Sequence, residues 1–92
     1  MMYEVKPTSH FKRDLKVIAR RGYDLSLLTA VIQTLAAGEP LAKKHTDHSL
    51  GGVWSKHREC HIKPDWLLIY KIENDILVLS LTRTGTHSDL FC

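Results

Sequence analysis

The length of 92 residues allows one compact core, so we expect a single domain over residues 1–92 and exclude a multidomain protein. The 43% hydrophobic and 25% charged residues are ordinary for a globular fold, and no apolar run approaches the ~20 residues that span a bilayer. Because no basic segment followed by a long apolar one opens the chain, we expect a cytoplasmic protein in which Cys60 and Cys92 are free thiols.

The first part of the chain predicts a strand followed by two helices. We expect the strand over residues 3–7, and then a helix whose first backbone N–H groups are capped by Thr8 or Ser9. Asp24 caps a second helix, and Gly22 and Gly38 end the two helices, which form a hairpin because their connection is short. The apolar positions at helical spacing are Phe11, Leu15 and Ile18, then Leu28, Ile32 and Leu35.

The second half of the chain predicts three antiparallel strands. A polar loop over residues 41–52 precedes them, and a break at 84–86 and a short tail over 87–91 follow. The expected strands cover residues 53–62, 66–72 and 76–82. This order predicts an α+β fold, in which the N-terminal strand and the two-helix hairpin pack on one face of a small antiparallel sheet.

Strand parity divides the residues of the first of these strands between the two sheet faces. His57, Glu59 and His61 share one face, whereas Cys60 and Ile62 share the other. We expect the histidines on the face that the helices leave exposed.

Six histidines in so short a chain are the main chemical feature. An imidazole has a reference pKa of ~6.5, so it exchanges a proton near neutral pH. Cleavage of RNA needs a base that takes the proton of the ribose 2′-OH and an acid that protonates the departing 5′-oxygen, without a metal. An arginine stabilises the charge that the phosphate gains, and a carboxylate orients a ring. Spacing alone leaves open the alternative that the histidines are unrelated surface residues.

Four stretches of the second half resemble one known family. They are DHSLGGVW at residues 47–54, RECH at 58–61, PDWLLIY at 64–70 and RTGTHSDLF at 83–91. This combination resembles the YafQ branch of the RelE/ParE toxin superfamily, densely from His48 onwards and more thinly over the helices. The resemblance implies a RelE-like fold and a ribosome-dependent mRNA endonuclease that is silenced by an antitoxin encoded beside it.

The resemblance also implies roles for individual residues. The implied catalytic residues are His48, His61, Asp65, Arg83 and His87, and the implied substrate-binding residues are Trp66, Phe91 and Lys63. We expect His87 to be the general acid and either His48 or His61 to be the base. Asp65 would orient one ring, and Arg83 would neutralise the phosphate.

Several of these residues have a structural alternative. Trp66 and Phe91 stack on or shape the splayed mRNA bases in the functional interpretation, but both could be core aromatics. Asp65 follows a proline and could be a turn residue. Arg83 has the parity of leucines that face the helices, so it reaches the site only if a bulge or a strand end lies near Thr82.

A basic helix face like that of the first helix is most often a solvated surface. In the functional interpretation this face and the basic residues of the loops contact ribosomal RNA, consistent with the net charge of +3. The same surface suits an acidic antitoxin segment that folds on binding, so we expect a toxin–antitoxin hetero-oligomer. The basic positions are Lys6, Lys12, Arg13, Lys16, Arg20, Arg21, Lys43, Lys44, Lys56 and Lys63.

Other interpretations remain at this point. His45 with His48, or His57 with Cys60 and His61, have the spacing of zinc ligands, but Cys60 and His61 point to opposite faces, so we expect no metal or other cofactor. If no metal is bound, we expect both His45 and His57 to be exposed surface residues. A ParE-like toxin that acts by binding a topoisomerase would not need the histidines, and a non-catalytic RNA- or antitoxin-binding module would not need them either.

Overall fold

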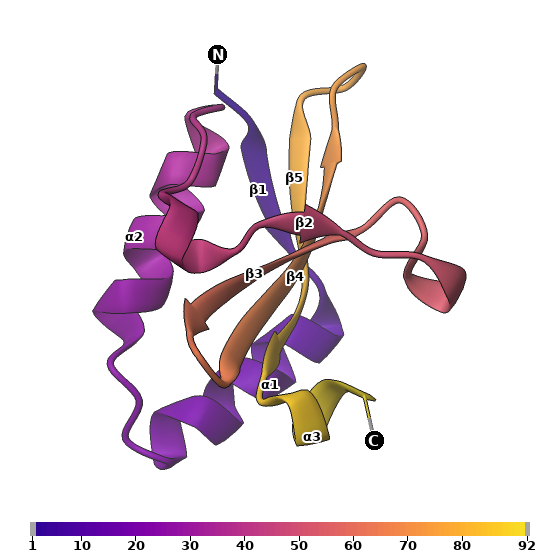
Figure 1. Cartoon of the computed structure of the whole chain (residues 1–92). Helices are drawn as coiled ribbons and strands as arrows, with labels where there is room; N and C mark the ends of the chain where they lie inside the picture. Colours follow the sequence, from indigo (N-terminus) through magenta and orange to yellow (C-terminus); the bar gives the residue numbers. More distant parts are fainter. Residues whose placement is uncertain (1, 92) are drawn as a thin grey trace.

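The computed structural model describes residues 2–91. Their elements are β1 Glu4–Pro7, α1 Ser9–Arg20, α2 Leu25–Ala36, η1 Lys43–His45, β2 His48–Ser49, η2 Gly52–Trp54, β3 Arg58–Lys63, β4 Trp66–Glu73, β5 Val78–Gly85 and α3 His87–Phe91. The strands form one sheet in the order β1-β5-β4-β3-β2, with α1 and α2 packed against it (Figure 1). The predicted α+β class is confirmed.

The sheet combines antiparallel and parallel pairing. β2, β3, β4 and β5 pair antiparallel in chain order, as expected for strands joined by short connections. β1 joins the other edge of β5 in parallel, with Glu4 opposite Val78 and Pro7 opposite Leu81. The chain then crosses through α1 and α2 to the far edge of the sheet, so the N-terminal and loop segments lie on opposite edges.

The two helices begin and end where their capping residues predict. Thr8, one of the two expected caps of α1, accepts a hydrogen bond from the backbone N–H of Phe11 at 3.0 Å. Asp24 caps α2 by accepting from the N–H of Ser26 at 3.0 Å. Gly22 adopts a left-handed φ of 80° directly after the C-cap of α1, a conformation that suits glycine.

The core lies between the helices and one face of the sheet. α1 packs on β5 and α2 lies over β3. Phe11 and Ile18 from α1, and Leu28 and Leu35 from α2, meet the inner residues of the central strands. Cys60 is a free thiol within this core, as predicted, whereas Cys92 lies outside the described residues.

The opposite face of the sheet is partly covered, although the sequence predicts it to be bare. Leu67 and Ile69 of β4 pack there against Leu90 of α3, with Leu50 and Trp54 beside them. The tail predicted over residues 87–91 is the helix α3, and it contributes to this second cluster. The face that the helices leave free is therefore partly covered by α3 and by the segment that contains Leu50 and Trp54.

The largest error of the sequence prediction concerns residues 53–57. They were expected in a strand, but β3 begins at Arg58, and residues 52–54 form the 3-10 turn η2. Lys56 has a φ of 71°, which a strand does not allow. Leu77 has a φ of 53°, and accordingly β5 begins at Val78 instead of residue 76. β5 also continues to Gly85, into the break expected over residues 84–86.

Within residues 2–91, no helix is long and apolar enough to cross a membrane.

Candidate active site

Strand register brings two of the predicted histidines together on the sheet face opposite the helices. His48 of β2 lies opposite Glu59 of β3, and His61 follows two residues later on the same side of that strand. Cys60 lies between them in sequence and points into the helical core, as parity predicts. The polar loop predicted over residues 41–52 contains β2, and this pairing is what fixes His48.

His87 completes a cluster of three imidazole rings. The ring centroids of His48 and His61 are 6.5 Å apart, and those of His61 and His87 are 5.8 Å apart. The rings come from β2, β3 and α3, three segments that are distant in sequence. The structure therefore brings together all three histidines that the resemblance implied.

Glu59 lies between two of these rings and was not among the predicted site residues. Its Oε1 is 3.5 Å from Nε2 of His48 and 3.4 Å from Nε2 of His61. The residue is only 5% exposed, and a buried carboxylate requires partners of this kind. Strand parity correctly placed Glu59 on the same sheet face as His61, but the sequence gave no indication that Glu59 would be buried.

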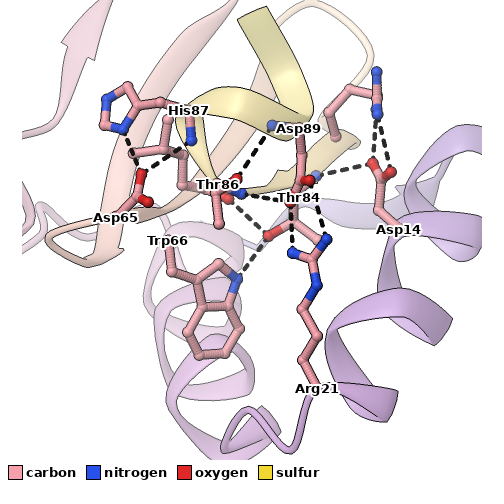
Figure 2. Close-up of polar contacts among 10 residues, drawn as sticks. Asp14, Arg21, Asp65, Trp66, Thr84, Thr86, His87 and Asp89 are labelled. Carbon is pink, nitrogen blue, oxygen red and sulfur yellow. Dashed lines mark hydrogen bonds and ion pairs between the residues drawn. The ribbon is translucent and has the colours of Figure 1, made fainter. Parts of the chain in front are cut away.

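Asp65 holds His87 from the turn between β3 and β4. Its Oδ1 accepts from the backbone N–H of His87 at 3.0 Å and lies 2.7 Å from the ring Nδ1 (Figure 2). The backbone N–H, and then the ring, lower the pKa of the Asp65 carboxyl from its ordinary value. A carboxylate at Nδ1 keeps a proton on that nitrogen, which leaves Nε2 free to face a substrate.

A hydrogen bond within the loop holds the ring of His48. The Nδ1 atom of His48 lies 2.8 Å from the carbonyl oxygen of Thr46. The preceding residue, Asp47, accepts from the hydroxyl of Tyr70 at 2.5 Å and from Nε of Arg58 at 3.2 Å. These contacts anchor the backbone next to His48 onto the central strand.

The prediction that His45 and His57 are exposed is wrong. Both are half-buried. His45 lies with Nδ1 2.7 Å from the carbonyl oxygen of His61, and the ring of His57 packs edge-on against Trp54 with centroids 5.6 Å apart. His45 therefore supports the strand that carries His61.

Arg83 follows the bulge that the sequence requires near Thr82, but its guanidinium binds a residue of α1. Ile69 pairs with Arg83 and Tyr70 with Leu81, so Thr82 is an extra residue in β5. The side chain then reaches Asp14 of α1, with Nε at 2.7 Å and Nη2 at 3.0 Å. Asp14 raises the pKa of the guanidinium by hydrogen bonding to it.

Trp66 is a core residue at the edge of the site. It is 2% exposed, and its Nε1 donates to the hydroxyl of Thr84 at 3.0 Å (Figure 2). Its ring meets that of Tyr23 edge-on at 5.0 Å. So deeply buried a ring is not placed to stack on a base, but with Asp65 and Lys63 it lines a pocket beside the site.

Phe91 is the exposed aromatic of the cluster. It is 44% exposed, and its ring centroid is 6.4 Å from that of His87 and 6.4 Å from that of Trp54. Of the two predicted aromatics, it is therefore the one that presents a face to solvent next to the histidines.

The same cluster offers donors to a metal ion. One atom each of Glu59, His61 and His87 lie within 4.8 Å of one another. Carboxylate and imidazole suit ions such as Zn²⁺ or Cu²⁺. Cys60, which the spacing alone could have grouped with His61, is fully buried on the other face.

Comparison with known proteins gives consistent matches over nearly the whole chain. The family model described as bacterial toxin of type II toxin-antitoxin system, YafQ, matches residues 3–92. The mRNA interferase toxin YafQ of Escherichia coli K12 is 34% identical over 89 residues, which cover 96% of this chain and 95% of that protein.

Two solved structures illustrate the likeness of fold. A metal-bound toxin from Helicobacter pylori has a TM-score of 0.92 and 44% identity, covering 99% of this chain and 100% of that one. The E. coli DinJ-YafQ toxin-antitoxin complex contains a chain with a TM-score of 0.91 and 32% identity, with 100% of both chains covered.

Proposed function

Because this chain belongs to the YafQ family of bacterial toxins of type II toxin–antitoxin systems, we propose that it cleaves mRNA by histidine acid–base catalysis. The observation that carries the proposal is the convergence of three imidazole rings on an exposed sheet face, at centroid distances of 6.5 and 5.8 Å. The name mRNA interferase, given to the E. coli relative, supports it. A toxin that acts only by binding would have no use for this convergence.

The proposed reaction is a transfer within the RNA. His48 or His61 takes the proton of the 2′-OH, whose oxygen attacks the adjacent phosphorus and forms a 2′,3′-cyclic phosphate. The bond from phosphorus to the 5′-oxygen breaks, and His87 protonates that oxygen as it leaves. Asp65 supports this role by holding the backbone and the ring of His87 in place through its contacts with the N–H and Nδ1.

Glu59 is the matching carboxylate on the base side. It lies at ion-pair distance from His48 and His61, so it can stabilise whichever ring becomes positive when it takes the proton. The two proton-transfer groups would thus each have a carboxylate behind them. One is buried in the sheet, and the other lies at the exposed turn.

We assign the phosphate to Arg83 and Lys63, and the bases to Phe91 and Trp66. Arg83 reaches a phosphate only by leaving Asp14, whereas Lys63 is exposed at the end of β3 and lines a hollow together with His61. Phe91 offers a ring for stacking, whereas Trp66 lines the pocket beside Asp65 and Lys63.

The proposed setting is the translating ribosome in the cytoplasm. Exposed basic residues of α1 suit sequence-independent contact with ribosomal RNA, and the ribosome would supply the positioning that a shallow site lacks. The antitoxin would be a cognate protein bound in a hetero-oligomer, as the E. coli relative is bound to DinJ.

The proposed chemistry needs no metal. Glu59, His61 and His87 could nevertheless hold one, and a related toxin is metal-bound. A metal on these rings would occupy the lone pairs that carry protons, so we expect Zn²⁺ or Cu²⁺ to inhibit. Toxin that is stripped with EDTA and freed of the chelator before it meets ribosomes in Mg²⁺ should still cleave. Loss of cleavage by the stripped toxin, restored by Zn²⁺ or Cu²⁺, would contradict this part of the proposal.

The deciding experiment maps mRNA 5′ ends after induction of the chain, with and without translation. We expect cuts in codon register that vanish when initiation is blocked, and that vanish in His87→Gln. His10→Gln is the matched control, because His10 is an exposed histidine on α1. Growth arrest without cuts would favour a toxin that acts by binding, and undiminished cuts by His87→Gln would remove His87 from the mechanism.

A further inference from the structure

The helix that carries His87 is held by an ion pair outside the catalytic cluster. Arg21 follows α1 as its C-cap, and its Nη1 donates to Oδ2 of Asp89 at 2.7 Å while Nη2 donates to Oδ1 at 3.1 Å (Figure 2). Two parallel bonds between a planar guanidinium and a carboxylate fix orientation as well as distance. α1 therefore constrains the position of α3.

Asp89 also closes the first turn of α3. Its Oδ2 accepts from the N–H of Thr86 at 2.9 Å, while its own N–H donates to the hydroxyl of Thr86 at 3.1 Å. This reciprocal pair is a capping box, and His87 is the residue directly inside it. Since a helix of five residues has little stability of its own, its placement depends on such contacts.

Gly85 allows the close approach that this arrangement requires. A Cβ atom at this position would lie 2.9 Å from Oδ2 and 3.0 Å from Cβ of Asp89. Any larger residue would push the carboxylate away from both the capping box and Arg21. The order Gly85, Thr86, His87, Asp89 is thus consistent with a turn built around the carboxylate.

A second residue of α1 holds the other end of the same turn. Asp14 accepts from the N–H of Thr84 at 3.1 Å and binds Arg83. It precedes Arg21 by seven residues, about two helical turns, so both side chains leave the helix on the same side. The segment from Thr84 to Asp89 is therefore clamped at both ends by one helix (Figure 2).

We propose that Arg21 is a positioning residue, which holds α3 through Asp89 so that the ring of His87 stays on Asp65 and faces the other histidines. It touches neither RNA nor the reacting atoms in this role. The consequence for rate rests on the function proposed above, whereas the consequence for the geometry of His87 does not.

The test compares Arg21→Ala and Arg21→Lys with Arg20→Ala. Arg20 is the preceding, exposed arginine, so the control removes the same charge from the same helix end. The first readout is the pKa of the Asp65 carboxyl, measured by NMR titration. In the parent protein the backbone N–H of His87 lowers this pKa. The second is the single-turnover cleavage rate and apparent affinity on mRNA-programmed ribosomes.

We expect Arg21→Ala to return the Asp65 pKa towards its ordinary value and to slow cleavage about 10- to 100-fold at saturating ribosome concentration, the scale of a displacement near 1 Å. Both alanine variants remove a charge that we assign to ribosomal RNA, so they should weaken the apparent affinity alike, whereas only Arg21→Ala should change the Asp65 pKa and the saturating rate. Arg21→Lys keeps the charge but loses the paired bonds, so its rate and its Asp65 pKa should lie between those of the parent and of Arg21→Ala. It replaces the alanine variant in the test if that variant does not fold.

Equal losses of the saturating rate in Arg20→Ala and Arg21→Ala, or a loss confined to affinity in Arg21→Ala, would overturn the proposal, because they indicate general RNA attraction. So would an Asp65 pKa that stays lowered in folded Arg21→Ala. If the parent chain cleaves no RNA but the Asp65 pKa responds to Arg21 alone, the positioning role stands and the proposed function fails.

Discussion

Thr84→Val should destabilise the protein although valine and threonine have nearly the same shape. Thr84 is 1% exposed, and its hydroxyl accepts from Nε1 of Trp66 at 3.0 Å and donates to the carbonyl of Leu67 at 2.7 Å. Within residues 2–91, every buried side-chain nitrogen and oxygen atom has such a partner. Valine can neither accept nor donate, so the substitution leaves the indole N–H unpaired in the core.

The expected cost follows from the two lost bonds. A buried donor without an acceptor costs about 1–3 kcal/mol, and the lost hydroxyl bond to Leu67 adds about 1 kcal/mol. The free energy of unfolding should therefore fall by about 2–4 kcal/mol. For a domain of this size, such a loss lowers Tm by roughly 10–25 °C.

Urea and thermal unfolding of a double-mutant cycle with Trp66→Phe measure this effect. Phenylalanine has no N–H to leave unpaired, so in that background Thr84→Val should cost only about 1 kcal/mol. Thr84→Ser, which keeps the hydroxyl and loses one methyl group, should cost about 1 kcal/mol. The reasoning fails if Thr84→Val lowers the free energy of unfolding equally in both backgrounds, or if the Thr84→Val variant has the same Tm as the parent protein.

Three further outcomes are expected. Burial raises the pKa of Cys60 to about 12, so in a Cys92→Ser chain a thiol reagent should label Cys60 only as fast as the protein unfolds, measured by mass spectrometry. Tyr70→Phe removes a hydrogen bond to Asp47 and should lower the free energy of unfolding by about 1–2 kcal/mol, measured in urea. Hydrogen bonds from Arg21 lower the pKa of Asp89, so the contribution of Asp89 to stability should be complete above pH ~4 and decline as the pH falls from there towards the pKa of the folded state. Urea unfolding of Asp89→Asn and of the parent across this pH range measures the contribution. A difference between the two proteins that does not depend on pH would refute the prediction.

The parts of the fold that the sequence predicts well are those with local signals. The caps at Asp24 and Gly22 bound the helices, because a side chain or a glycine satisfies a helix end in any context. β4 is an apolar run with covered faces, and such a run has few alternatives to a central strand. The sequence predicts a bulge or a strand end near Thr82 only if Arg83 serves the site; the register has the bulge, whereas the guanidinium binds Asp14 of α1.

The elements that the sequence did not predict are short and depend on distant residues. β2 has two residues and forms because β3 offers it an edge. α3 has five and is held by α1. No window of sequence contains both sides of such a contact, so periodicity cannot reveal it. Glu59 was overlooked for the same reason: its role depends on β2, the strand that brings His48 to it.

The carboxylates of the site explain how the acid side of a pH–rate profile should be read. Hydrogen bonds from His87 lower the pKa of Asp65, and bonds from Arg21 lower that of Asp89. Both carboxylates therefore remain ionised at about pH 5–6. The anchors of α3 persist in this range, so activity that falls here reports proton transfer and not a loosened helix. Asp89→Asn tests the distinction: it should lower the whole profile without moving its acid limb.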